Sequence, residues 1–188
     1  AIAPRIKQAD PQAQILIGGL LLPCAPGTIT PENFAFCGMS KFIRGVLTNG
    51  GGPYFDGVGF NSYDYYCDRD FPEKPCVPPY SNPDWNSSGA TNGTVGVLKA
   101  QYLRAVLADY GVVGKYLVNM ESALVCDARW CTAKTNPDVD FQTHYEWAKS
   151  EYMSMLFAQM SNEGMHATLW YNLRDNNGLP IQDLTQWG

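Results

Sequence analysis

The chain has 188 residues and a formal net charge of −5, with 16% charged and 13% aromatic residues. This length supports one domain with a core of its own, but it falls short of the roughly 200 to 250 residues of a complete eight-stranded α/β barrel. Lysine and arginine form no cluster, which argues against a nucleic-acid partner, and no apolar run reaches the roughly 18 residues of a membrane span.

The first half of the chain alternates between helical and strand patterns. Residues 2–9 have the pattern of a helix, and an apolar run at residues 14–19, closed by two glycines, predicts the first strand. Apolar side chains, Phe42 among them, recur at helical spacing within residues 39–49. Alternating apolar and polar residues predict a second strand at residues 58–63.

The second half repeats this alternation after a long polar segment. Residues 64–95 are rich in Pro, Asn, Ser and Gly and predict a long loop, which in a compact domain is usually functional. A strong helical pattern at residues 97–110 leads to a third strand at residues 116–121. The longest helical pattern, at residues 141–162, leads to a fourth strand at residues 167–172.

Alternation of strands and helices predicts a parallel sheet with helices outside it. In the second strand Val58 and Phe60 point to one side, which is apolar and suits helix packing. Asn61 and Tyr63 point to the other side, which suits a barrel interior that opens into a cleft. We therefore predict that residues 1–188 form a single α/β domain, half of a (β/α)8 TIM barrel with four parallel strands and outer helices, completed by a second chain or a second copy.

The six cysteines fall in three successive predicted loops, two in each, and pairing within each loop is the simplest arrangement. A zinc site would need close Cys-x-x-Cys spacing or nearby histidines, and neither is present, so we expect no metal and no cofactor. Disulfides argue for an oxidising, extracellular setting, either secreted or at the cell surface. The expected bonds are Cys24–Cys37, Cys67–Cys76 and Cys126–Cys131.

The third predicted strand ends on a carboxylate, Glu121. Catalytic carboxylates of barrel enzymes lie at the C-terminal ends of parallel strands. Hydrolysis of a glycosidic bond normally needs two carboxyl groups, and this strand offers one of them. Glu121 is therefore a candidate catalytic residue, and the structural alternative is a buried glutamate paired with an arginine.

Five segments stand out in order along the chain: residues 15–20, 42–47, 55–63, 119–122 and 169–171. Together they resemble the second half of clan A glycoside hydrolases, which are retaining enzymes on a TIM barrel. The resemblance covers nearly the whole chain and implies activity on β-linked glycosides.

The resemblance also implies roles for individual residues. Glu121 matches the nucleophile at the end of strand seven of the clan, and Tyr63 matches an aromatic hydroxyl that hydrogen-bonds to this nucleophile. Asn61 stands where strand six of the clan often has a histidine, which implies different contacts with the ligand. Trp170 matches the tryptophan that forms the floor under the reacting sugar.

The acid/base of the clan is a glutamate in an Asn-Glu pair that ends strand four, and that strand is not in this chain. Asn162-Glu163 has the same letters but precedes the fourth predicted strand, so we place it in a surface turn on the opposite face. Asp64 and Asp175 follow predicted strands and are candidates for the missing acid. Asn172 and Asp64 are candidate substrate ligands. Aromatic residues that either line sugar subsites or pack the loop on itself are Tyr65, Tyr66, Tyr80 and Trp85.

We predict a glycosidase that hydrolyses β-linked glycosides by a retaining mechanism, with Glu121 as nucleophile and the acid/base outside this chain. The expected partners are a carbohydrate substrate and either a second copy, forming a dimer, or a missing N-terminal half of the barrel; we expect neither nucleic acid nor membrane. The alternatives are a non-catalytic carbohydrate-binding half-barrel and a structural fragment. Affinity for a sugar without turnover would indicate the first alternative, and the absence of both would indicate the second.

Overall fold

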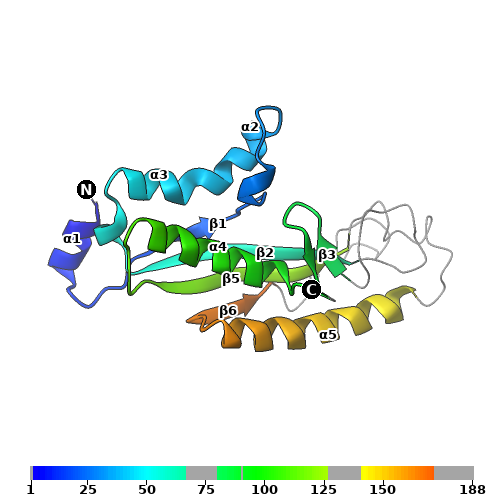
Figure 1. The fold of residues 1–188 in the computed structure, drawn as a ribbon. Coiled ribbons are helices and arrows are strands. Elements are labelled where there is room, and N and C mark those ends of the chain that lie inside the picture. Colours follow the sequence, from blue (N-terminus) through cyan, green and yellow to red (C-terminus); the bar gives the residue numbers. More distant parts are fainter. Residues whose placement is uncertain (1, 67–79, 90, 127–140, 172–188) are drawn as a thin grey trace, which may run out of the picture.

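A computed structural model describes residues 2–66, 80–89, 91–126 and 141–171 of the chain (Figure 1). Helices and strands follow one another along these residues, with short 3-10 turns between some of them. In chain order the elements are α1 (Ile2–Ala9), β1 (Leu16–Leu20), α2 (Phe34–Cys37), α3 (Phe42–Thr48), β2 (Gly57–Tyr66), β3 (Tyr80–Asn82), β4 (Ser87–Ser88), α4 (Val95–Asp109), β5 (Tyr116–Val125), α5 (Phe141–Asn162) and β6 (Ala167–Trp170).

The strands form one mixed, six-stranded sheet in the order β4-β3-β2-β5-β6, and β1 also pairs with β2. β1, β5 and β6 join the sheet in parallel, whereas β3 is antiparallel to β2 and β4 is antiparallel to β3. The prediction of a half TIM barrel with four parallel strands is therefore wrong.

The difference arises in the segment that was expected to be a long loop. β3 and β4 form a hairpin there, around a turn that contains Pro83 and ends at Asn86, whose φ of 51° lies in the left-handed region that asparagine tolerates. β2 runs on to Tyr66 and pairs with this hairpin through Tyr65 and Ser81. The hairpin and β1 thus lie along the same edge of β2, at its two ends.

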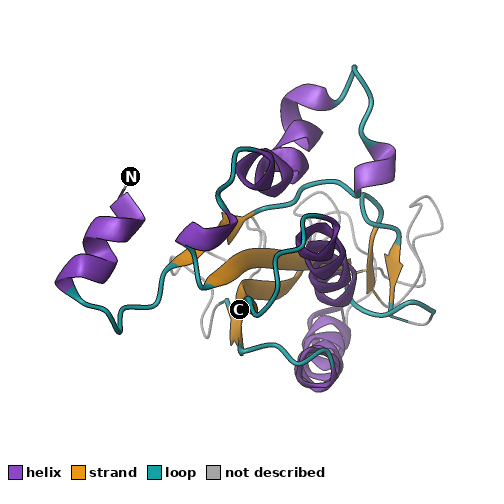
Figure 2. Cartoon of the chain, turned by 60° about the vertical axis from the view of Figure 1, so that its left-hand side comes forward, coloured by secondary structure: helices purple, strands orange, loops and turns teal. Residues whose placement is uncertain are grey.

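The helices α3, α4 and α5 pack on one face of the sheet (Figures 1 and 2). Val58 and Phe60 on β2 are fully buried there, on the side that the alternation predicts for helix packing. One apolar cluster joins α3 and α4 to β2, and a second joins α5 to β5. The other face of the sheet carries the candidate site.

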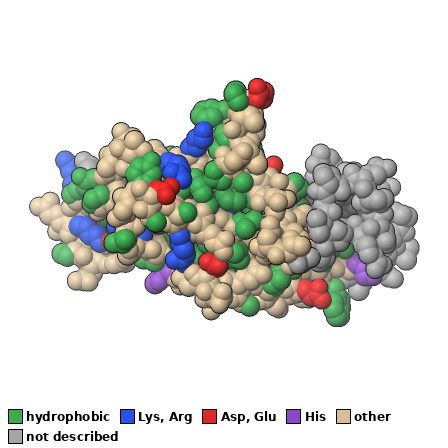
Figure 3. Space-filling view, in the orientation of Figure 1, with side chains coloured by type: hydrophobic (Ala, Val, Ile, Leu, Met, Phe, Trp, Pro, Cys, Tyr) green, Lys and Arg blue, Asp and Glu red, His purple; other side chains and the backbone are tan. Residues whose placement is uncertain are grey.

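The helix predicted at residues 39–49 begins later and turns differently from the expected orientation. α3 starts at Phe42, and its buried side chains are Ile43 and Leu47. Phe42, one of the apolar residues at helical spacing, is 53% exposed. Figure 3 shows hydrophobic side chains at the surface in the region of α2 and α3. The exposed ones in this stretch are Phe34 and Phe36 in α2, Met39 in the 3-10 turn Gly38–Lys41, and Phe42 at the start of α3.

A disulfide joins Cys24 in the loop after β1 to Cys37 in α2, with the two Cα atoms 5.1 Å apart. Cys126 at the end of β5 is also disulfide-bonded. The remaining cysteines of the predicted pairs, Cys67, Cys76 and Cys131, lie outside the described residues. Across the described ranges, no helix combines the length and the apolar character needed to cross a membrane.

Candidate functional site

Two long parallel strands carry the candidate site. β2 and β5 pair from Gly57 beside Tyr116 to Tyr65 beside Val125. The ladder continues four residues past Glu121, to Val125, because β2 also extends far enough to pair with it. The prediction that the strand ends on Glu121 is therefore wrong, and the carboxylate projects from the face of the sheet.

A β-bulge decides which face Glu121 occupies. Phe60 pairs with Asn119. The next residue of β2, Asn61, pairs with Glu121, so Met120 is an extra residue on β5. Strict alternation would put Glu121 on the same face as Asn119, which is fully buried. The extra residue moves Glu121 to the opposite face of the sheet.

Glycines make room for this bulge. A Cβ atom on Gly59 would lie 2.3 Å from the Met120 Sδ, and one on Gly18 would lie 3.0 Å from the same sulfur. Real Cβ atoms essentially never come as close as the first distance and rarely as close as the second, so side chains at these two positions would push against Met120. The glycines of β1 and β2 thus support the local geometry that sets Glu121.

Tyr63 and Glu121 meet on this face. The Tyr63 hydroxyl donates a hydrogen bond to Glu121 Oε2, and both residues are half-buried. Burial, followed by the bond to Glu121, raises the pKa of Tyr63, so its hydroxyl stays protonated. The pair therefore joins a fixed donor to a carboxylate at a position that solvent reaches.

Asn61 lies directly beside this pair. It is the register partner of Glu121 and is 7% exposed. Its side-chain Oδ1 is buried and has no hydrogen-bond partner among the described residues. A buried carbonyl oxygen without a donor is costly, so this atom is an acceptor that a ligand hydroxyl would satisfy.

Tyr171, which has no predicted role, lies just past β6 beside the candidate site. Its backbone N–H donates to Ser122 O at 2.9 Å, which fixes the chain just past β6. Tyr171 follows Trp170, the register partner of Ser122, so alternation puts it on the Glu121 face, and its electrostatic interaction is a minor cause of the raised pKa of Tyr63. The signal in the sequence was its position next to Trp170, on the opposite side of the same strand end.

The structure does not bring Trp170 to Glu121. Its ring lies 6.1 Å from the ring of Tyr152 on α5, and it packs against the apolar cluster beneath that helix. β6 pairs with β5 through Ser122 and Trp170, after the same register irregularity that the bulge introduces. Trp170 therefore packs on the helix face, on the opposite side of the sheet from the expected sugar platform.

Asp64 also faces the helices. It is fully buried, and it accepts hydrogen bonds from Ser87 Oγ at 2.5 Å, Val95 N at 2.9 Å and the Tyr152 hydroxyl at 2.9 Å. Burial raises the pKa of Asp64, and its three donors oppose this shift. This arrangement ties β2 to β4, α4 and α5, so Asp64 is a structural residue here, neither a substrate ligand nor the missing acid.

Most of the predicted subsite aromatics are core residues. Tyr66, Tyr80 and Trp85 are buried, and the Trp85 Nε1 donates to Leu22 O at 2.8 Å. Tyr65, on the same face as Tyr63, is 37% exposed. The two other predicted site residues, Asn172 and Asp175, lie outside the described residues.

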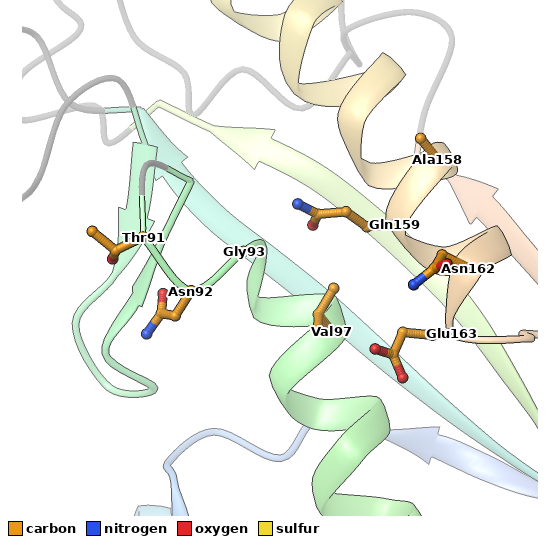
Figure 4. Close-up of a pocket in the computed structure, with 8 residues that line it drawn as sticks. All are labelled: Thr91, Asn92, Gly93, Val97, Ala158, Gln159, Asn162 and Glu163. Atoms are coloured by element: carbon orange, nitrogen blue, oxygen red, sulfur yellow. The ribbon is translucent and has the colours of Figure 1, made fainter.

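The Asn-Glu pair lies at the end of α5, on the helix side of the sheet. Asn162 and Glu163 line an open groove of about 490 Å³ between α5 and the loop that precedes α4 (Figure 4). Glu163 Oε1 accepts a hydrogen bond from Gln101 Nε2 at 3.0 Å. The carboxylate is thus held at the surface, away from the Tyr63–Glu121 face.

No family model, curated protein or solved structure matches this chain. Within the described ranges, no group of three His, Cys, Asp or Glu side chains is arranged to hold a metal ion. Tyr63, Asn61 and Glu121 therefore form the candidate site among the described residues.

Proposed function

We propose that this chain acts on β-linked glycosides by a retaining mechanism in which Glu121 is the nucleophile. The observation that supports this most is the hydrogen bond from the Tyr63 hydroxyl to the Glu121 carboxylate on a solvent-accessible face. It is the pairing that the resemblance to clan A glycoside hydrolases implies. An ionised carboxylate, held by one donor, is suited to nucleophilic attack on an anomeric carbon.

The proposed reaction has two steps. A Glu121 oxygen bonds to the anomeric carbon, and the bond to the leaving group breaks, so that the leaving oxygen departs with the electron pair. Tyr63 holds the other carboxylate oxygen and keeps its orientation through the attack. Water then cleaves the glycosyl ester, which releases the sugar and restores the Glu121 carboxylate.

A natural leaving group needs a proton, and a second carboxyl group normally supplies it. We propose that this acid lies outside this chain, on a second copy or a separate partner chain. Within the described residues, the candidate Asp64 is committed to the helix face. We also propose an extracellular setting, which the Cys24–Cys37 disulfide supports.

The test uses a probe that needs no acid. A dinitrophenyl β-glycoside with fluorine at the carbon next to the anomeric centre releases a stable dinitrophenolate, and its glycosyl-enzyme hydrolyses slowly. A panel of such probes built on common neutral sugars should add one sugar mass to the protein, and peptide mapping should place it on Glu121. Glu121→Gln should abolish the adduct, whereas Glu163→Gln, a matched surface control, should not. Failure of every probe to label the wild-type protein would overturn the proposal.

The second candidate is a carbohydrate-binding protein without turnover. The position of Asp64 favours it, because the candidate second carboxylate within the described residues lies on the wrong face of the sheet. Calorimetric titration with neutral oligosaccharides separates the two functions. Saturable binding by a protein that no probe labels would establish the binding function instead.

A further inference from the structure

Lys99 is a buried cation that the proposed reaction does not use. It lies on α4 and is 4% exposed. Its Nζ donates hydrogen bonds to Leu21 O at 2.7 Å and to Asn61 O at 2.8 Å. One side chain from the helix layer therefore joins the exit of β1 to the middle of β2.

The loop that Lys99 holds after β1 is strained. Leu22 has a φ of 46°, in the left-handed region that residues other than glycine rarely adopt. Trp85 Nε1 donates to Leu22 O at 2.8 Å, and the Lys99 ammonium lies 5.7 Å from the centre of the Trp85 ring. Two buried donors thus maintain a conformation that costs free energy, and such strain is often found at functional sites.

The other carbonyl that Lys99 holds belongs to the candidate site. Asn61 is the register partner of Glu121, and no donor in the described part of the chain reaches its buried Oδ1. Tyr63, two residues further along β2, points to the same face and holds the Glu121 carboxylate. A shift of β2 at Asn61 would therefore move two groups: the Asn61 Oδ1 acceptor, and the Tyr63 hydroxyl that donates to Glu121.

The charge on Lys99 responds to its surroundings. Burial lowers the pKa of Lys99 to about 7, against the opposing effects of Asp64 on β2 and Asp84 in the β3–β4 turn. The aromatic ring of Trp85 also faces the ammonium. Bonds from an ammonium to carbonyl oxygens are charge-assisted, so loss of the proton weakens both contacts of Lys99.

We propose that Lys99 is a positioning residue for the Glu121 site: its ammonium fixes Leu21 and Asn61 from behind the sheet, so that the reactivity of Glu121 depends on the charge of Lys99. This inference rests on the proposed function, because it is measured through reaction at Glu121. It also implies that the reactivity of Glu121 depends on pH through Lys99, which the Tyr63–Glu121 pair alone does not imply.

The test compares the rate at which the fluorinated dinitrophenyl glycoside labels Glu121 in matched variants. Lys99→Met fills the buried space without a charge and should slow labelling at about pH 6 by tenfold or more. Lys115→Met is the control, because Lys115 also donates to a backbone carbonyl, Phe55 O at 2.5 Å, and also lies over an aromatic ring, at 5.1 Å. That lysine lies at the opposite end of the β2–β5 pair, and its loss should leave the labelling rate unchanged.

The pH profile separates positioning from simple support of the fold. Wild-type labelling should fall as pH rises through about 7, the pKa of Lys99. Lys115→Met should keep this fall and Lys99→Met should lose it. Lys99→Arg, which stays charged, should restore much of the rate and remove the fall.

The possible failures are distinguishable. If the wild-type protein is labelled and Lys99→Met reacts at the wild-type rate with the wild-type pH profile, the role of Lys99 is overturned and the proposed function stands. If no probe labels the wild-type protein, both fall. If neither Lys99 variant folds, as judged by circular dichroism, the wild-type profile decides alone: a flat rate through pH 7 overturns the role, and a fall supports it.

Discussion

Tyr63 and Asp64 are neighbours on β2, yet their polar groups belong to different systems. Tyr63 faces the side that carries Glu121, where both residues of the pair are half-buried. Asp64 faces the helices, where it is fully buried and accepts three hydrogen bonds. Neighbouring residues of β2 therefore point to opposite faces. One belongs to the accessible Tyr63–Glu121 pair, and the other to the buried hydrogen bonds of Asp64 with Ser87, Val95 and Tyr152, which we call the closed network.

The structural carboxylate of Asp64 and the candidate catalytic carboxylate of Glu121 differ in how the polar groups around them are satisfied. The three hydrogen bonds that Asp64 accepts tie β2 to β4, α4 and α5, so this carboxylate serves to hold the fold together. Next to Glu121, in contrast, the Oδ1 of Asn61 is buried and has no donor among the described residues. Buried acceptors without a donor are exceptions in proteins, and this one lies beside an accessible carboxylate.

Removing the closed network should produce the largest change in stability. Asp64→Ala leaves the donors from Ser87, Val95 and Tyr152 without their acceptor in a buried place. We expect the free energy of unfolding to fall by about 3–5 kcal/mol, because each buried donor left without its acceptor costs about 1–3 kcal/mol. Urea denaturation followed by circular dichroism measures this loss.

Asp109→Ala is the matched control for this experiment. Asp109 pairs with Arg44 at 2.9 Å, and its side chain is 55% exposed. A surface ion pair of this kind contributes about 0–1 kcal/mol. Equal losses in the two variants would contradict the distinction between the closed network and the surface.

Breaking the accessible pair should affect reaction more than stability. Tyr63→Phe removes the donor to the Glu121 carboxylate and keeps the ring. A hydrogen bond to a charged group contributes about 1.5–3 kcal/mol, so labelling of Glu121 should slow by about ten- to a hundredfold. Tyr110→Phe is the control: it also removes a hydroxyl that makes a hydrogen bond, to Thr48 Oγ1 at 2.8 Å at the surface after α4, and it should leave the rate near the wild-type value. A Tyr63→Phe rate within twofold of wild type would remove Tyr63 from the site.

The pH dependence of stability sharpens the contrast, because Lys99 should act in opposite directions on stability and on reaction. The pKa of Lys99 is about 7 in the folded protein and 10.5 for an ordinary lysine, so the unfolded chain binds more protons between these values. The contribution of Lys99 to the free energy of unfolding is therefore largest above pH 10.5, where the side chain is neutral in both states. It is lost as the pH falls through the folded pKa of about 7. Relative to Lys99→Met, the wild-type protein should gain about 2 kcal/mol between about pH 7 and about pH 9. A gap that stays constant across this range would contradict the buried charge.

Much of the local structure could be predicted from the sequence. The helical pattern at residues 141–162 and the burial of Val58 and Phe60 follow from periodicity, because packing against one layer imposes it. The β3–β4 hairpin was missed, because its strands are only three and two residues long and carry polar side chains. Its one sequence signal was the turn around Pro83 and Asn86, and turn residues also occur in ordinary loops.

The candidate site was predictable in residue type more than in geometry. The resemblance paired Tyr63 with Glu121, and the structure contains a hydrogen bond between them. Strict alternation in β5 would have put Glu121 on the helix face, and only the bulge at Met120 reverses this. Bulges depend on pairing between strands that are far apart in sequence, so no local pattern reveals them. The face of Trp170 follows from the pairing of β6 with β5, which sets Thr168 beside Asn119 and Trp170 beside Ser122, and this pairing has no signal in the local sequence either.

The smallest effects test which residue of the β6 end belongs to which face. Trp170 packs near Tyr152 under α5, so Trp170→Leu should lower the free energy of unfolding by about 1–2 kcal/mol and leave the labelling rate of Glu121 unchanged. Tyr171 lies near Tyr63 and is 38% exposed, so Tyr171→Phe should keep the stability and change the labelling rate by only about two- to threefold. We would measure the free energy of unfolding and the labelling rate for both variants. Trp170→Leu should change only the first, and Tyr171→Phe only the second. If Trp170→Leu slowed labelling strongly while Tyr171→Phe did not, the tryptophan would contact the sugar after all, and the assignment of faces at this strand end would be reversed.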